Sequence, residues 1–434
     1  MSELQLLVTM VIVFVVMLLI KIPVAYALGL SSLVIFYIMG IPFTSAINSM
    51  YNSVNSFPLL AIPLFMLLAQ LMTAGGITER LFKISDAFVG HISGGLGQVN
   101  VFISLLFGHL SGSAQADAAG IGSMIVPMMK KAGYPVGFTV AITACSSTLG
   151  VILPPSVLMI VYGAMSGTSI AALFVAGFVP GFLVCFTQMG YTYYMARKYN
   201  WPRGERSTWA QRAVAVKNGL PVIILPFIII GGTSSGMFTA TESAAIACMF
   251  AIILIFVVYR SFNIWDIPKI IVATAQDFSL TMFALASAGI TGWLVAFLGA
   301  PQMIATWILG ITDSYLGVYL LLIMFLLIVG TTLSPITVII IFMPIIQQLG
   351  ASVNINDVHL GIVVILTLSL GLVTPPYGSC LMIVSQIGGI PITRAFISVI
   401  PIILIVLGII LLGVIFPELF LFLPRLVVPM AFPS

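Results

Sequence analysis

Charged side chains are scarce in this sequence. Asp, Glu, Lys and Arg make up 6% of the 434 residues, whereas hydrophobic residues make up 61% and the mean hydropathy is +1.24. A water-soluble domain needs fewer apolar residues in its core and more charge on its surface. Several apolar runs are also long enough to cross a bilayer as helices. The composition therefore predicts an all-α polytopic membrane protein, whose residues 4–20 form a retained first span rather than a removed signal.

Motifs for several other functions are missing as well. The four cysteines lie in apolar runs without C-x-x-C spacing, which argues against a disulfide framework or a zinc site. The sequence has no G-x-x-x-x-G-K-[ST] phosphate loop and no H-E-x-x-H helix, so ATP-driven pumping and metalloproteolysis have no motif. His109 and Ser111 could be imagined as a hydrolase pair, but no third residue orients them. We therefore do not expect an enzyme.

A proline pair occurs twice, each time inside a long apolar stretch. Residues Leu149–Pro155 read LGVILPP, and residues Leu370–Pro376 read LGLVTPP. A proline donates no backbone hydrogen bond and clashes with the preceding turn, so a helix is interrupted at each pair. In a bilayer, such backbone is tolerated only where protein covers it or where it lines a cavity. Two broken apolar segments at matching places are typical of a transporter's binding site.

The sequence divides into two halves with the same order of elements, each with spans, a re-entrant helical hairpin and a proline-broken helix. The first half is predicted at 1–196, with its hairpin at 95–131 and its broken helix at 135–166. The second half is predicted at 218–434, with its hairpin at 316–349 and its broken helix at 358–388. Residues 197–217 are predicted to be a polar cytoplasmic linker between them.

Matching residues support a repeat of the two halves. Around the breaks the halves align without a gap, pairing Gly150, Pro154, Pro155, Gly167 and Pro180 with Gly371, Pro375, Pro376, Gly388 and Pro401. After a four-residue shift, Pro127 and Gly133 align with Pro344 and Gly350. Because each half is expected to cross the membrane an odd number of times, the second half is predicted to be inverted relative to the first.

The cations give the orientation. With the N-terminus outside, nearly all of them fall inside: Lys21, Arg80, Lys83, Lys130, Lys131, the 197–217 linker, Arg260, Lys269 and Arg394. Arg425 alone falls outside. Because cytoplasmic loops carry an excess of Lys and Arg, both termini are predicted to lie outside.

Three local predictions complete the description. The Asn- and Ser-rich stretch 41–57 reads as a polar loop. Residues 265–277 read as an amphipathic segment, separate from a span at 280–298. Thr239 and Glu242 have the spacing that caps the N-terminus of a helix.

Four polar interruptions lie at membrane depth, namely the two proline breaks and the tips of the two hairpins. The first tip reads GHLSGSAQAD over residues 108–117 and the second GTTLSP over residues 330–335. In an inverted repeat each tip lies beside a break. Sodium favours oxygen ligands, which the break carbonyls offer together with the hydroxyls of Ser111, Ser113, Ser146, Ser147, Thr148, Thr331, Thr332 and Thr374. Because helix N-termini there suit an anion, the sequence predicts an anion carried together with cations.

Asp117 is the acidic residue that lies well inside the apolar stretches of the first half. A carboxylate at membrane depth is a functional hypothesis by default. A structural pair with His109, or capping of the second hairpin arm, is the alternative for this residue. For the whole chain, the alternative to an alternating-access transporter is a passive channel or a structural membrane subunit.

Several stretches together resemble a known family. They are the first tip with its continuation to Ser123, the segment Pro127–Pro135, the segment Leu153–Ser156 and the segment Phe238–Glu242. They closely resemble the large membrane subunit of tripartite ATP-independent periplasmic (TRAP) transporters, and the resemblance covers essentially the whole chain. The general look of the sequence is similar to that of members that carry sialic acid.

The resemblance implies sodium-coupled import of a carboxylate, of the sialic-acid or C4-dicarboxylate class, across the bacterial inner membrane by an elevator mechanism. Its implied partners are a periplasmic binding protein and a small four-helix membrane subunit, here expected as a separate chain. At least two sodium ions are implied, one at Ser111, Gly112, Gly150 and Pro154, the other at Gly330, Thr332, Gly371 and Thr374. The substrate is implied to meet Ser111, Ser113, Asp117 and Ser156.

Overall fold

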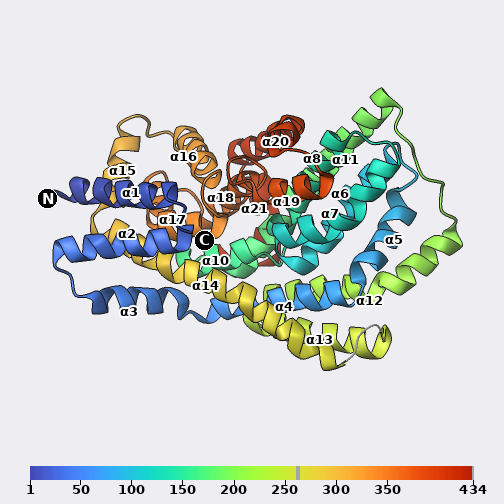
Figure 1. The fold of residues 1–434 in the computed structure, drawn as a ribbon, viewed down its shortest axis with the longest axis horizontal. Helices are drawn as coiled ribbons and strands as arrows, with labels where there is room; N and C mark the ends of the chain where they lie inside the picture. Colours follow the sequence, from blue (N-terminus) through green and yellow to red (C-terminus); the bar gives the residue numbers. More distant parts are fainter. Residues whose placement is uncertain (261–263, 433–434) are drawn as a thin grey trace.

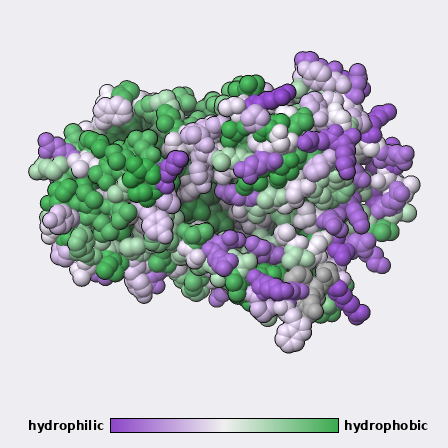
Figure 2. Space-filling view, viewed as in Figure 1, coloured by the Kyte–Doolittle hydropathy of each residue, from purple (hydrophilic) through white to green (hydrophobic). Residues whose placement is uncertain are grey.

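The computed structural model describes residues 1–260 and 264–432, which form helices joined by short turns. Within these ranges, seven helices are long and apolar enough to cross a membrane, or eight if one bent pair counts as a single span. The face of the molecule in Figure 2 is largely hydrophobic over α1 and α2. Hydrophilic side chains gather at the opposite end of this face, over α5 and the connection from α11 to α12. The prediction of an all-helical polytopic membrane protein is confirmed.

The N-terminal part runs along the elongated molecule, from α1, α2 and α3 at one end to α5 near the other (Figure 1). It comprises α1 (Glu3–Leu19), α2 (Val24–Met39), α3 (Phe43–Val54), α4 (Ala61–Ala74) and α5 (Ile77–Val89). The predicted loop at 41–57 is wrong, because most of it forms α3. The Ser49 and Ser53 hydroxyls donate to the carbonyls one turn earlier, at 2.9 and 2.7 Å, and so do not compete with the helix. Ser53 also packs directly on Gly289, which leaves no room for a side chain there.

A helical hairpin and an interrupted helix follow. They comprise α6 (Gly95–Ser111), α7 (Ala114–Lys131), α8 (Val136–Ser147), α9 (Leu149–Ile152), α10 (Val157–Ser166) and α11 (Ile170–Tyr199). The helix is interrupted between Ile152 and Val157, and its two parts meet at an angle of 41°. The bond between Pro154 and Pro155 is cis, as is the bond between Pro375 and Pro376.

The connection between α11 and α12 is shorter than the sequence indicated. Only residues 200–208 are irregular, because a capping box of Thr208 and Gln211 starts α12 (Trp209–Ser234) inside the predicted linker. The irregular residues are held in place, since Gly204 N donates to Gly90 O at 2.9 Å and the Tyr134 hydroxyl donates to Pro202 O at 3.1 Å. The linker is therefore anchored at both α5 and the turn after α7.

The helices α13 and α14 come next after α12. In α13 (Ala240–Ile253), the Glu242 carboxylate accepts from Thr239 N at 2.8 Å, so the predicted capping box is confirmed. The next helix, α14 (Ile267–Phe297), is continuous, so the predicted division into an amphipathic segment and a separate span is wrong. Residues 274–281 include five polar side chains, but Ser279 and Thr281 donate to the preceding turn at 2.8 and 3.3 Å, and no Gly or Pro interrupts the helix there.

The last part repeats the order of hairpin and interrupted helix. It comprises α15 (Ala300–Leu309), α16 (Tyr315–Gly330), α17 (Pro335–Ser352), α18 (Asp357–Gly371), α19 (Ser379–Gly388), α20 (Ile392–Ile415) and α21 (Glu418–Val427). The interruption here covers residues 372–378. The amphipathic helix α21, which follows the last predicted span, was not expected from the sequence.

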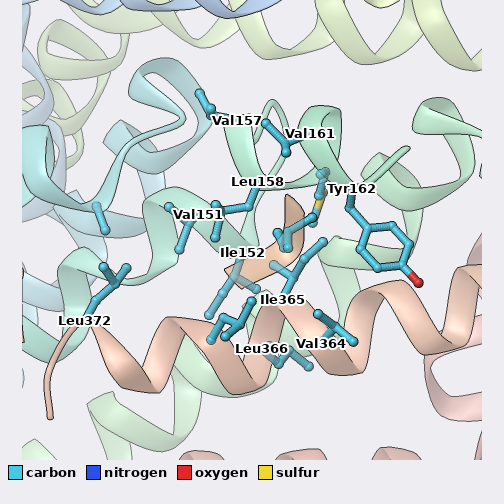
Figure 3. Packing of buried hydrophobic residues seen from close by; sticks show 14 of the residues in the cluster. Val151, Ile152, Val157, Leu158, Val161, Tyr162, Val364, Ile365, Leu366 and Leu372 are labelled. Carbon is cyan, nitrogen blue, oxygen red and sulfur yellow. The ribbon is translucent and has the colours of Figure 1, made fainter. Parts of the chain in front are cut away.

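The two interrupted helices pack against each other in the core. Figure 3 shows side chains of α9 and α10, on either side of the first break, lying over α18. Leu158 and Tyr162 on α10, and Ile365 and Leu366 on α18, are at most 3% exposed. Because lipid tails are as apolar as these side chains, close packing rather than removal from water stabilises such contacts between helices in a bilayer. The core therefore fixes the two breaks relative to one another.

Candidate functional site

The first hairpin tip lies directly on the first proline break. A β-carbon added at Gly108 would lie 3.1 Å from the backbone of Gly150, and one added at Gly112 would lie 2.8 Å from Pro155 O. Gly112 has a φ of +60°, which turns the chain from α6 into α7. Val157 N also donates to Gly112 O at 3.4 Å. The structure thus brings together Ser111 and Gly112 of the tip with Gly150 and Pro154 of the break.

Asp117 reaches into this contact from the first turn of α7. Its side chain is 0% exposed, and its Oδ1 accepts from the Ser111 hydroxyl at 2.5 Å. Its other oxygen, Oδ2, is buried without a hydrogen-bond partner among the described residues, and a β-carbon at Gly150 would lie 2.6 Å from it. A buried polar atom without a partner is costly and is rare in folded proteins. This carboxylate oxygen is therefore a candidate ligand for a cation.

His109 is bonded to the break rather than to Asp117. Its Nδ1 lies 2.8 Å from Pro154 O, and since a carbonyl only accepts, Nδ1 carries the hydrogen. The ring also contacts Phe178 of α11, with centroids 5.6 Å apart. His109 thus satisfies one lone pair of the carbonyl that the proline pair leaves without a helical partner, and the second lone pair remains for another donor or an ion.

The second tip and the second break make a similar contact. A β-carbon on Gly371 would collide with Gly330 O, so the two backbones touch. Tyr377 N donates to Thr331 O at 2.7 Å, which joins the tip to the break. The hydroxyls of Thr332 and Thr374 each donate to a carbonyl of the preceding turn, at 2.9 and 2.7 Å, and so present only their lone pairs outward. The structure thus brings Gly330 onto Gly371, whereas Thr374 is half-buried and Thr332 is exposed.

Both tips open onto one cavity of about 850 Å³. One wall consists of the tips and breaks, including Ser111, Ser113, Gln115, Ser334 and Tyr377. The facing wall consists of α4 and α14, and here Gln70 Nε2 donates to Asp277 Oδ2 at 3.3 Å. The cavity is thus enclosed by segments from both halves of the chain.

The four residues predicted to meet the substrate occupy different places. Ser111 and Ser113 line the cavity, whereas Asp117 and Ser156 are fully buried behind it. The Ser156 hydroxyl donates to Val151 O at 2.6 Å and accepts from Met159 N at 3.4 Å, so it caps α10. Ser113 likewise caps α7 by accepting from Ala116 N at 3.4 Å.

The sequence reasoning missed several polar side chains on the cavity wall, among them Gln70, Gln115, Asp277 and Tyr377. Gln115 donates to Ser379 Oγ at 3.2 Å across the two halves, while Gln70 and Asp277 lie on helices far from either tip in sequence. Tyr377 lies just after the second proline pair. Asp277 could have been found as a carboxylate inside a long apolar stretch, had the continuous helix been recognised. Gln70 carries no charge and sits in an ordinary apolar span, so it gave no signal.

Comparisons with known proteins agree with this architecture. The family model described as "Tripartite ATP-independent periplasmic transporter, DctM component" matches residues 11–419. The sialic acid TRAP transporter large permease protein SiaM of Vibrio cholerae is 36% identical over 93% of this chain and 95% of that protein. The 2,3-diketo-L-gulonate TRAP transporter large permease protein YiaN of Escherichia coli is 32% identical over 92% of this chain and 94% of that protein.

A third relative and a solved structure extend the comparison. The C4-dicarboxylate TRAP transporter large permease protein DctM of Pseudomonas aeruginosa is 34% identical over 87% of this chain and 88% of that protein. The YdaH transporter of Alcanivorax borkumensis has a similar fold, with a TM-score of 0.61 over 87% of this chain and 88% of that one, at 14% identity. The match to the family model and these relatives show that the chain belongs to the DctM component family of tripartite ATP-independent periplasmic transporters, a family of membrane permeases and not of enzymes.

Proposed function

We propose that this permease couples the import of a carboxylate to sodium. The observation that carries the proposal is the buried Oδ2 of Asp117, which lacks a partner among the described residues and lies against Gly150 at the break. A buried charge is stable only when it is paired or bound to a metal. The described residues offer no neighbouring Lys or Arg for an ion pair with Asp117, since both of their ion pairs lie elsewhere. Sodium fits because the surrounding groups are oxygens.

The first sodium site would use oxygens of Ser111, Gly112, Gly150 and Pro154, with Asp117 as the anionic ligand. In this role Asp117 belongs to the ion rather than to the substrate, in keeping with its full burial behind the cavity wall. The hydrogen bond from Ser111 fixes the carboxylate so that Oδ2 faces the break. His109 leaves one lone pair of Pro154 O free for the ion.

The second sodium site would use Gly330, Thr332, Gly371 and Thr374. The backbones of Gly330 and Gly371 touch, and both threonine hydroxyls direct their hydrogens away, toward their own helices. Such hydroxyls present only lone pairs to an ion. This site lacks a carboxylate in its proposed ligand set, so we expect it to bind sodium more weakly than the first.

We propose that the two halves form an inverted repeat and that the hairpins and interrupted helices move as one body. The repeated order of elements, and a glycine of each hairpin packed on the break of its own half, support the repeat. The facing cavity wall of α4 and α14 would belong to a fixed scaffold. We propose that the connection from α11 to α12 is cytoplasmic and that both termini are periplasmic, and the cations of this hydrophilic connection support that orientation.

The substrate would bind in the cavity between the tips and α4 with α14. Its carboxylate would meet the N-terminus of α7, where Ser113 and the first backbone amides lie. The relatives are named for sialic acid, 2,3-diketo-L-gulonate and C4-dicarboxylates, and we propose a substrate of the sialic-acid or C4-dicarboxylate class. A periplasmic binding protein would deliver it, and a small membrane subunit, as a separate chain, would complete the scaffold.

Proteoliposomes test this function. The permease is reconstituted with its small subunit and supplied outside with its binding protein, loaded with sialic acid or with succinate. We expect accumulation above the outside concentration only when sodium is higher outside than inside, and none when potassium replaces sodium. Accumulation that ignores the sodium gradient would contradict the coupling, and equilibration without accumulation would indicate a passive channel.

A further inference from the structure

Each half-helix that follows a proline break is held at its far end by the hairpin of the other half. Lys130, near the end of α7, donates from Nζ to Gly388 O at 2.9 Å. Gln347, on α17, donates from Nε2 to Ser166 O at 2.9 Å. Gly388 is the last residue of α19 and Ser166 is the last residue of α10. We name these two hydrogen bonds the crossed clasps.

The two clasps occupy equivalent positions. Lys130 and Gln347 each lie three residues after the prolines that align between the halves, Pro127 and Pro344. The two donors differ in charge but reach the same kind of acceptor, a carbonyl that the end of a helix leaves free. Attraction of a cation to the negative end of a helix accounts for Lys130 but not for the uncharged Gln347. The shared property is the hydrogen bond itself.

The helices joined by the first clasp are also joined near the cavity. Gln115, in the first turn of α7, donates to Ser379 at the start of α19 at 3.2 Å. Between these two bonds, Gly122 lies against Val384 and Ile387, and Figure 1 shows α7 and α19 side by side. The helix α7 starts at the first tip, whereas α19 starts at the second break. One rigid pair of helices therefore reaches both proposed sodium sites.

We infer that the crossed clasps couple the two sodium sites, so that sodium at one site favours sodium at the other. The inference rests on the proposed sodium-coupled function. An ion at the first site orders the tip and hence α7, and the clasp transfers that order to α19 and the second break. The second clasp transfers order from the second tip through α17 to α10 and the first break. Such coupling is reciprocal, so each ion raises the affinity of the permease for the other by the same factor.

Four substitutions test the clasps. Lys130→Met and Gln347→Met remove the donor, whereas Lys130→Gln and Gln347→Lys each install the donor found in the other half. The exposed neighbours Lys131 and Gln348 provide matched controls, as Lys131→Met and Gln348→Met. For each protein, the sodium dependence of uptake into proteoliposomes gives a half-saturating concentration and a Hill coefficient. Sodium-induced thermal stabilisation of the purified permease is measured in parallel, because it does not require transport.

We expect a Hill coefficient near 2 for the wild type, a lower value for each Met variant, and a value near 1 for the Lys130→Met, Gln347→Met double variant. The half-saturating sodium concentration of the double variant should rise about fivefold, the low end of typical coupling between sites. The two donor exchanges and both controls should retain the wild-type coefficient. If a clasp only capped its helix, its removal would lower the melting temperature without changing the Hill coefficient.

The experiments distinguish failure of the proposed function from failure of the coupling alone. A wild type whose uptake and melting temperature ignore sodium would refute the proposed function and the coupling with it. A wild type with sodium dependence that is not cooperative, or cooperativity unchanged in the double variant, would refute the coupling alone. Loss of cooperativity in the donor exchanges as well would show that the hydrogen bond is not the coupling element.

Discussion

Replacement of Asp117 by asparagine is the sharpest test of the first ion site. Asparagine has nearly the same shape and can still accept from Ser111 through Oδ1, but it carries no charge and presents an N–H group where Oδ2 faces Gly150. The substitution therefore removes the anionic ligand and adds a donor that repels a cation, while the packing of the tip on the break is retained.

The expected loss of sodium affinity can be estimated from the charge of the buried carboxylate. Two unit charges interact by about 4 kcal/mol at about 4 Å and an effective dielectric constant of about 20, and a directly bound ion lies closer than that, so this value is a lower bound. If half of this is recovered by ligand rearrangement, about 2 kcal/mol is lost, which corresponds to a roughly 30-fold weaker affinity. We expect the half-saturating sodium concentration of uptake to rise by at least about this factor.

Although Asp117→Asn should weaken sodium binding, it should not destabilise the fold when sodium is absent. A buried charge lacking a partner destabilises the fold, so its removal should leave the melting temperature in potassium unchanged or raised. Thermal unfolding in sodium and in potassium measures both effects, with Asp313→Asn, an exposed residue after α15, as the matched control. If Asp117→Asn retained the sodium affinity of the wild type, or lost stability equally in both salts, Asp117 would not be an ion ligand.

Three further predictions concern other parts of the molecule. Gly371→Ala should abolish uptake and destabilise the fold by about 1 to 3 kcal/mol because its methyl group collides with Gly330 O; Gly408→Ala, where the added methyl group meets open space, should leave uptake and thermal unfolding unchanged. Asp277→Asn should strengthen binding of an anionic substrate to the purified permease about fivefold, since a charge of the same sign no longer faces the cavity, a change of about 1 kcal/mol; weaker binding in equilibrium measurements would instead make Asp277 a direct contact. Thr239→Ala should remove the capping box of α13 and cost about 1 kcal/mol in thermal unfolding, with uptake retained.

The proline breaks and the order of elements could be read from the sequence because their signals are local. A proline pair interrupts a helix wherever it stands, and clusters of glycine and hydroxyl residues such as those at the tips are typical of turns. The same local reasoning failed at α3 and α14. There, polar side chains bond to the preceding turn or pack on a neighbouring helix, and neither condition can be seen from composition alone.

The site was predicted less completely than the fold. Asp117 attracted notice as a carboxylate in an apolar stretch, but the free position of Oδ2 depends on how the tip packs on Gly150. Ser156 carried the right chemistry, yet its hydroxyl donates to Val151 O of α9 and accepts from Met159 N as the cap of α10. Gln70 and Asp277 meet the tips only through the tertiary arrangement, because α4 and α14 are distant in sequence from both hairpins.

The anchored linker has a consequence for how the chain holds together. Only residues 200–208 connect the two halves irregularly, and Glu205 and Arg206 are exposed between the anchors at Pro202 and Gly204 and the start of α12. The halves interlock, since α7 packs on α19, α10 on α17 and α2 on α14. The peptide bond after Glu205 therefore contributes little to keeping the halves assembled. Co-expressed fragments 1–205 and 206–434 should form a split permease, whereas either fragment alone would expose the buried faces of its hairpin to lipid.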